Sequence, residues 1–192
     1  MSNKIMIVAE SFTYHTGYSI QALQLLRALT DLGHDVVFYH AYLPNMKLLD
    51  KPTLDVMAQE KGTHISAEFD PRLEGNDYMT GRKNFDKAIN KFNPEIVIAV
   101  CDIYNLEFAV KSPRRKSFKL VGYCPVDSEI LGLDEMFLID SCDIFVSPTI
   151  WGQKVCIDNN LTAYYIPHTV STDYLRFYQG NDFMKAKENA KN

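Results

Sequence analysis

The stretch Lys4-Ile-Met-Ile-Val-Ala9 is followed by a polar loop, a helical pattern and a second apolar run at Val36–Phe38. In the helical pattern, large apolar residues recur every three positions, and Gly33 follows as a left-handed stop. These residues are Ile20, Leu23, Leu26, Leu29 and Leu32. Strands that are apolar at consecutive positions are buried on both faces, as in parallel sheets covered by helices on each side. Residues 4–39 therefore predict strand, loop, helix and strand.

The same alternation continues along the rest of the chain. Further strands are predicted at Ile65–Phe69, Glu95–Cys101, Lys119–Cys124, Asp143–Ser147 and Ala163–Ile166. Helices are predicted at Thr53–Lys61, over Phe85–Phe92, after Ile103, at Asp134–Ser141 and after Thr149. The predicted fold class is therefore α/β: a doubly wound, mostly parallel, Rossmann-like sheet of about seven strands with helices on both faces.

Length and composition limit the class of protein. The 192 residues favour one core, and 46% hydrophobic with 23% charged residues is ordinary globular usage. The longest apolar run, Ile96–Cys101, has six residues, far fewer than the roughly 20 that cross a bilayer. The apolar run directly before Glu10 has only five residues, too few for the apolar region of a signal peptide. We therefore expect a cytoplasmic protein with at most peripheral membrane contact.

Charge and cysteine spacing argue against two further classes. A net charge of -4 disfavours general nucleic-acid binding, because that affinity comes from clustered cations. No two cysteines have the two-residue spacing of metal knuckles or redox turns. They are Cys101, Cys124, Cys142 and Cys156. We expect reduced thiols that pack as small hydrophobic groups, and no metal site.

Ligands of a doubly wound sheet bind outside the carboxyl ends of its strands, which draws attention to the first loop. This loop, Glu10-Ser-Phe-Thr-Tyr-His-Thr-Gly-Tyr-Ser19, runs directly into a helix whose free amides and dipole favour an anionic phosphate. Gly17 would let the backbone approach that phosphate, and neighbouring aromatic residues could stack on a ring or donate a hydrogen bond. They are Tyr14, His15 and Tyr18. The alternative has equal weight: the glycine serves only the turn, and a serine or threonine caps the helix.

Carboxylates at strand ends are the next candidates. Asp102 follows one predicted strand, and Asp127 lies in a loop that Pro125 stiffens. Either aspartate could orient a hydroxyl group or act as a base, although Asp102 could instead cap the following helix. The chain lacks Gly-x-Gly-x-x-Gly, a Walker lysine motif, Gly-x-Ser-x-Gly and His-x-x-x-His. These absences argue against a dinucleotide dehydrogenase, a P-loop NTPase, a serine hydrolase and a zinc enzyme.

One segment is strongly basic. Lys111-Ser-Pro-Arg-Arg-Lys-Ser-Phe-Lys119 carries five cations in nine residues, between a predicted helix and a predicted strand. It could touch anionic lipid headgroups. Because it precedes a strand, at the edge away from the predicted site, a solvated connection is the favoured interpretation.

Several motifs together resemble a known family. They are Lys4-Ile-Met-Ile-Val-Ala9, Leu32-Gly-His-Asp-Val-Val37, Asn93-Pro-Glu-Ile-Val-Ile98, Asp143-Ile-Phe-Val-Ser-Pro148 and Ile166-Pro-His-Thr-Val-Ser-Thr-Asp173. In this order, and with the glycine loop, they resemble the amino-terminal half of a GT-B glycosyltransferase of family 4. The resemblance covers residues 4–177. The last motif is the most specific, because it is similar to the segment through which the chain leaves the first Rossmann-like domain.

The resemblance implies a retaining transferase that moves a sugar from a nucleotide-sugar donor to a sugar, lipid or protein acceptor. Residues 1–172 would form the acceptor-side domain and residues 173–192 a crossover and tail, with the donor-binding domain absent. No metal or other cofactor is implied. By position, the implied catalytic residues are Asp102 and Asp127, and the implied substrate-binding residues are Tyr14, His15, Thr16, Gly17, Tyr18, Ser19 and His168.

The sequence also departs from the family pattern. Thr16 stands where a second glycine is frequent, Cys101-Asp102 stands where a histidine is frequent, and Thr169 and Ser171 replace glycine and aspartate. Because the donor half is missing, we expect little activity from the chain alone. A donor-binding subunit or a homo-oligomer would supply the rest. Two alternatives remain open: a noncatalytic binding or structural module derived from GT-B, and a flavodoxin-like carrier.

Overall fold

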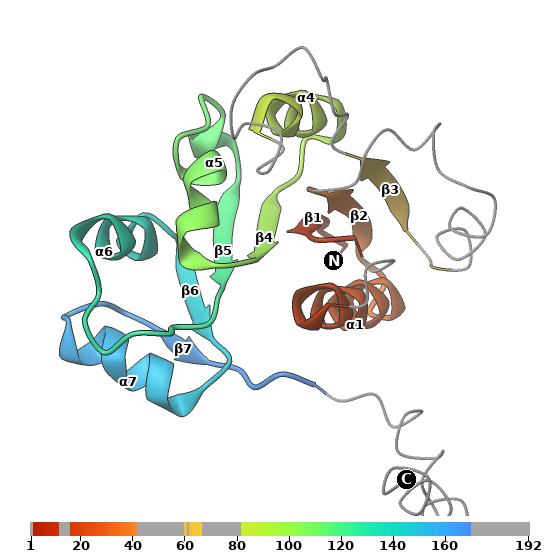
Figure 1. Ribbon diagram of the computed structural model, residues 1–192. Coiled ribbons are helices and arrows are strands. Elements are labelled where there is room, and N and C mark those ends of the chain that lie inside the picture. Colours follow the sequence, from red (N-terminus) through yellow and green to blue (C-terminus); the bar gives the residue numbers. More distant parts are fainter. Residues whose placement is uncertain (1, 12–15, 42–59, 61, 67–81, 170–192) are drawn as a thin grey trace, which may run out of the picture.

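The sheet has seven strands, all paired in parallel (Figure 1). A computed structural model describes residues 2–11, 16–41, 60, 62–66 and 82–169. The strands are β1 (Lys4–Ala9), β2 (Asp35–His40), β3 (Thr63–Ser66), β4 (Ile96–Val100), β5 (Lys119–Tyr123), β6 (Ile144–Ser147) and β7 (Tyr164–Tyr165). Their order is β3-β2-β1-β4-β5-β6-β7, which confirms the predicted doubly wound α/β class.

Helices cover both faces of the sheet. They are α1 (Gly17–Asp31), α4 (Arg82–Phe92), α5 (Glu107–Val110), α6 (Leu133–Asp140) and α7 (Ile150–Asp158), with short 3-10 turns η3 (Ile103–Leu106) and η4 (Arg115–Ser117). Helix α1 packs on β1, β2 and β4, and Figure 1 shows α4 and α5 on the opposite side of the strands. This division follows from right-handed connections, because the chain moves one way from β1 to β3 and the other way from β4 to β7.

Consecutive residues of β1 pack into the hydrophobic clusters on opposite faces of the sheet. Met6 packs with Phe85 of α4 in one buried cluster, whereas Ile7 packs with Leu26 of α1 in the other. Phe85 is fully buried, and its ring meets the ring of Phe108 edge-on at a centroid distance of 4.8 Å. This two-sided burial is why the sequence shows uninterrupted apolar runs rather than alternation.

The described elements follow the predicted ones closely. Helix α1 ends before Gly33, whose φ of +85° is the left-handed stop that the sequence predicted. The helix predicted after Ile103 is broken into η3 and the short α5. Of the helix predicted at Thr53–Lys61, only Glu60 is described. The last residues of the strand ending at Phe69 and residues 173–192 lie outside the described residues. None of the helices in the described part of the chain has the length and apolarity that a bilayer span requires.

The cysteines are free thiols, and three of them are buried, as predicted. Burial raises the pKa of the Cys142 thiol to about 12 and that of Cys156 to about 11. Cys124 is fully buried, and burial together with a hydrogen bond to Cys101 also raises its pKa. These thiols therefore remain protonated at neutral pH and behave as small apolar groups.

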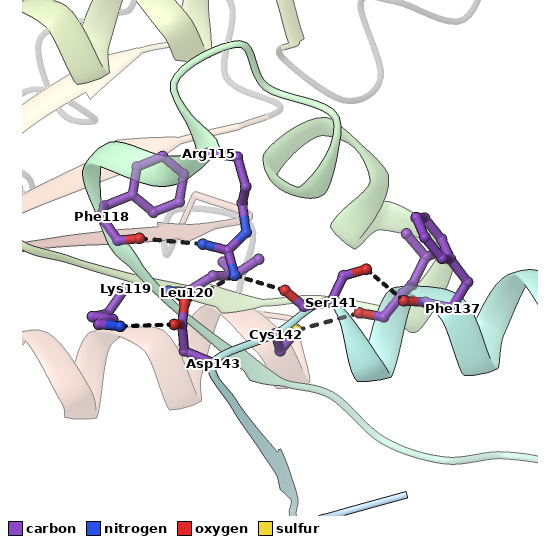
Figure 2. Close-up of polar contacts among 9 residues, drawn as sticks. Arg115, Phe118, Lys119, Leu120, Phe137, Ser141, Cys142 and Asp143 are labelled. Carbon is purple, nitrogen blue, oxygen red and sulfur yellow. Dashed lines mark hydrogen bonds and ion pairs between the residues drawn. The ribbon is translucent and has the colours of Figure 1, made fainter.

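An ionic network ties together the amino ends of β5 and β6 (Figure 2). The Nη2 atom of Arg115 donates to the Ser141 carbonyl at 2.6 Å and to Oδ2 of Asp143 at 2.8 Å. Its Nη1 donates to the Phe118 carbonyl at 3.2 Å. Lys119 Nζ donates to the second oxygen of Asp143 at 3.1 Å. One guanidinium thus joins the end of α6 to two strands.

We expect this network to make the free energy of unfolding depend on pH in the acidic range. Burial raises the pKa of Asp143, but hydrogen bonds from the Leu120 amide, Arg115 and Lys119 outweigh burial and hold the pKa below its ordinary value. The stabilisation is therefore present above about pH 4 and is lost as pH falls through the lowered pKa. Asp143→Asn should lower the free energy of unfolding by about 1 to 2 kcal/mol at neutral pH. Urea denaturation should show this difference shrinking below about pH 4, and an undiminished difference would contradict the assignment.

The first turn of α7, which follows β6, requires a glycine. A Cβ atom on Gly152 would lie 2.4 Å from Oγ of the buried Ser147 and 3.0 Å from Cβ of Val126. At Gly17, by contrast, an added Cβ meets no atom within 4 Å. We expect Gly152→Ala to lower the free energy of unfolding by about 2 kcal/mol in urea denaturation, and Gly17→Ala to leave it unchanged or higher. Equal stability of the two variants would refute this steric account.

Candidate functional site

A crevice is expected at the carboxyl ends of β1 and β4, because the order of the strands reverses between them. These two strands are neighbours, but the chain leaves β1 toward β2 and leaves β4 toward β5. The loops that follow them therefore diverge to opposite faces, and the crevice between such loops is where doubly wound sheets bind ligands. Most of the described candidates from the sequence lie at this edge.

A hydrogen bond to a carboxylate joins the two sides of the crevice, and a second phenol binds the same carboxylate. The Tyr18 hydroxyl, on the first turn of α1, donates to Oδ1 of Asp102, which follows β4. The Tyr104 hydroxyl donates to Oδ2 of the same aspartate at 2.9 Å. Asp102 stands at the N-cap position of η3 but makes no capping hydrogen bond with its side chain. The helix-cap alternative for Asp102 is therefore wrong, because both carboxylate oxygens already accept from tyrosines.

The pKa of Tyr18 shows that Asp127 lies near the hydrogen-bonded pair of Tyr18 and Asp102. Burial raises the pKa of Tyr18 well above its ordinary value, and the hydrogen bond to Asp102 and the charges of Asp102 and Asp127 raise it further. Asp127 thus lies within electrostatic reach of the Tyr18 hydroxyl, although its own side chain is exposed. Tyr18 stays protonated at neutral pH and serves as a fixed donor.

Thr16 and Ser19 shape the start of α1. The Thr16 Oγ1 atom accepts from the Ser19 amide at 3.2 Å, and its hydroxyl donates to Oε2 of Glu10 at 2.5 Å. The Ser19 hydroxyl donates to the Thr16 carbonyl at 2.9 Å and is fully buried. The capping alternative holds for Thr16. Ser19, expected to bind substrate, has no open side toward a ligand, because it sits beneath the helix start.

Gly17 is not required by the turn. Its backbone does not lie in the left-handed region, and the position that a Cβ would take is empty. The structure therefore contradicts the alternative in which this glycine serves only the turn. The exposed residue leaves the amino end of α1 open to an anionic group. Tyr14 and His15, two other predicted binding residues, lie outside the described residues.

The segment after β7 crosses the carboxyl edge toward α1. The Tyr123 hydroxyl, at the end of β5, donates to the Ile166 carbonyl at 3.2 Å, and its ring lies 5.6 Å from the ring of His168. The Gln21 side chain on α1 donates to the Thr169 carbonyl and accepts from the Thr169 amide, both at 2.9 Å. Partial burial lowers the pKa of His168, so its imidazole is neutral at pH 7.

Sequence reasoning missed several residues that hold this edge together. Glu10, Tyr104, Tyr123 and Gln21 position the candidates without being candidates themselves. For Glu10 a signal existed, because it is a carboxylate directly after a strand. The other three carry no local signal, since their partners come from distant parts of the chain.

A separate cleft of about 710 Å³ opens at the amino ends of β4, β5 and β6. Its lining includes Glu95, Arg115, Lys119, Phe137 and Asp143. Two of its cations are already engaged by Asp143 and by backbone carbonyls. This cleft does not coincide with the predicted site. We retain the carboxyl edge as the candidate site, because there the fixed donor and two carboxylates converge.

Comparison with known proteins supports the fold. No family model and no curated protein matches the sequence. A glycosyltransferase from Rickettsia africae ESF-5 is 13% identical, with a TM-score of 0.65 over 99% of this chain and 49% of its own. HepE from Anabaena, solved with UDP and glucose, is 9% identical, with a TM-score of 0.61 over 89% of this chain and 46% of its own. UDP-GlcNAc 2-epimerase from Neisseria meningitidis, solved with UDP-GlcNAc, is 10% identical, with a TM-score of 0.60 over 97% and 53%.

The likeness at these identities concerns the fold. The chain has the Rossmann-like fold seen in GT-B glycosyltransferases, and it spans about half the length of these solved structures. Sugar transfer and epimerisation both occur among the matched proteins, so the fold alone does not select the reaction.

We expect a double-mutant cycle to detect the bond between α1 and β4. Tyr18→Phe and Asp102→Asn should show a coupling of about 1 to 2 kcal/mol in the free energy of unfolding, because each removes one partner of a hydrogen bond to a charged group. Tyr104→Phe is the matched control and should couple less, because that side chain is 65% exposed. Additive effects of the Tyr18 and Asp102 substitutions would mean that the bond does not form in solution.

Proposed function

We propose that the chain is the amino-terminal, acceptor-side half of a retaining glycosyltransferase of family 4 type. It would act with a donor-binding partner to move a sugar from a nucleotide-sugar to an acceptor. The observation that carries this proposal is the composition of the carboxyl-edge site, where the exposed carboxylate of Asp127 and an open helix start lie beside the hydrogen-bonded pair of Tyr18 and Asp102. The GT-B-like fold supports it.

The described residues suit the acceptor side of the reaction. Asp127 is exposed, so its carboxylate can accept a hydrogen bond from an acceptor hydroxyl and orient that oxygen toward the sugar. Asp102 is held by Tyr18 and Tyr104 and shapes the wall behind it. The open amino end of α1 at Gly17 would meet the donor phosphates. The neutral imidazole of His168 can both donate to and accept from a sugar hydroxyl.

The same site lacks what the leaving group needs. When the sugar leaves, negative charge develops on the nucleotide diphosphate, and preorganised cations must stabilise it. Among the described residues assigned to the site, none is lysine or arginine. The matched structures are about twice as long as this chain. We therefore assign the nucleotide site and its cations to a second domain or chain, and expect these 192 residues by themselves to turn over poorly.

Exposed apolar residues concentrated in one part of the chain support assembly. Of the twelve large apolar residues exposed in the described part of the chain, ten lie between positions 130 and 166, and the others are Leu32 and Tyr104. The ten are Ile130, Leu133, Phe137, Ile144, Ile150, Trp151, Ile157, Tyr164, Tyr165 and Ile166. Concentrations of exposed apolar residues mark interaction sites. This concentration equally favours the second candidate function, a noncatalytic GT-B-derived binding module.

The flavodoxin-like alternative receives no support. Flavodoxin-like sheets have five strands in the order 2-1-3-4-5. Here β6 and β7 extend the sheet to seven strands, and the chain then crosses back to α1 through Thr169. Purified protein without a flavin absorbance band would agree with this.

Calorimetry can separate the proposal from a binding module. UDP-sugars titrated into the chain alone should give little heat. Addition of a donor-binding chain encoded in the same genome should give binding and transfer. In that complex, Asp127→Ala should lower transfer at least about 100-fold, and Gly17→Val should weaken donor binding about tenfold. Asp158→Ala, an exposed carboxylate on α7, is the matched control and should have no effect.

Two results would refute the proposal. Tight binding of a nucleotide-sugar by the isolated chain would contradict the division between two halves. Unchanged transfer in both Asp127→Ala and Gly17→Val would remove these residues from the site and favour the noncatalytic module.

A further inference from the structure

The segment Lys111–Lys119, here called the basic segment, concentrates positive charge on an acidic protein. Its nine residues contain five cations and no acid. The whole chain has 20 lysines and arginines against 24 acids, so the rest of it has 15 cations for those same acids. Glu107 and Asp143, on neighbouring parts of the chain, pair with three of these cations, so the excess positive charge rests mainly on the other two.

The fold holds the basic segment in one shape. The buried Ser112 hydroxyl donates to Oδ1 of Asp86 on α4 at 2.5 Å and accepts from the Arg114 amide at 3.0 Å. The Ser117 hydroxyl donates to the Arg114 carbonyl at 2.8 Å. Arg115 turns inward and binds the end of α6 and Asp143 (Figure 2). The segment is therefore an ordered scaffold rather than an unstructured connection.

This scaffold displays the other four cations outward. The side chains of Lys111 and Lys119 are 60% and 75% exposed, although each has an acidic partner. Arg114 and Lys116 are also exposed, and neither forms an ion pair with another of the described residues. Phe137, which lines the adjacent cleft, is 57% exposed. Cations beside an exposed aromatic ring suit a membrane surface, because the cations can contact the lipid headgroups while the ring enters the apolar region beneath them.

We propose that the basic segment docks the protein onto an anionic phospholipid surface. Such a surface meets one face of a protein, and here the outward cations of the basic segment stand on a chain whose remainder carries a net negative charge. A nucleic acid that follows a broader surface would meet the acidic remainder. A merely solvated connection would not need a fixed shape. Here the inward bonds of Arg115 hold Arg114 and Lys116 in a defined outward position. Because the segment precedes β5, docking would leave the carboxyl-edge site uncovered.

Vesicle co-sedimentation tests this proposal. The protein should sediment with vesicles of phosphatidylcholine mixed with phosphatidylglycerol, not with phosphatidylcholine alone, and added salt should release it. Arg114→Glu combined with Lys116→Glu should lower the partition at least about tenfold. Arg27→Glu combined with Lys154→Glu makes the same charge change elsewhere on the surface and should preserve most of the binding. Circular dichroism should show that both double variants are folded.

Several outcomes would overturn the proposal. They are absence of binding by the wild-type chain to the anionic vesicles, equal binding to the neutral vesicles, and an equal loss in the two double variants. Saturable binding of inorganic phosphate that prevents sedimentation would mean a free-anion site instead. A gel shift with a single-stranded oligonucleotide, without vesicle binding, would mean a nucleic-acid surface.

Discussion

The reversal of chain direction between β1 and β4 is the constraint on which the rest of this structure depends. Because β1 lies between β2 and β4, the connections on its two sides fall on opposite faces of the sheet. Helix α1 therefore begins at the carboxyl edge directly across from the end of β4. This placement allows the Tyr18 hydroxyl to reach Asp102 over a separation of 84 residues. Without the reversal, the fixed donor and the carboxylates would not share one crevice.

Charged groups at the two ends of the strands serve different purposes. At the amino ends, Arg115 and Asp143 satisfy each other and nearby backbone groups, and their bonds hold α6, β5 and β6 together. At the carboxyl ends, Asp102 binds neutral phenols, and Asp127 stays exposed. A carboxylate without a cationic partner retains its capacity to accept a hydrogen bond from a ligand. This contrast is why we assign the proposed chemistry to the carboxyl edge, although a cleft of about 710 Å³ lies at the other one.

The proposed division of a transferase between two chains agrees with where the surface is apolar and where it is charged. Exposed apolar residues concentrate between positions 130 and 166, whereas the outward cations concentrate at Lys111–Lys119. The two regions meet at Phe137 and differ in the partners they would accept: an apolar protein face in one case and an anionic lipid surface in the other. A protein that carries both could bind a partner chain while it is held at a membrane, with its site left open.

Local sequence determined the strands, the main helices and the loops that lead to the site. Uninterrupted apolar runs such as the one in Lys4–Ala9 indicate burial on both faces, and Gly33 indicates a left-handed turn. Both features can therefore be predicted without knowledge of the fold. Only the tertiary structure decided that Asp102 binds Tyr18 rather than capping η3, that Ser19 is buried, and that Gly152 must be glycine. The physical reason is that burial patterns are local properties of the chain, whereas hydrogen bonds and steric contacts between distant elements depend on how those elements cross.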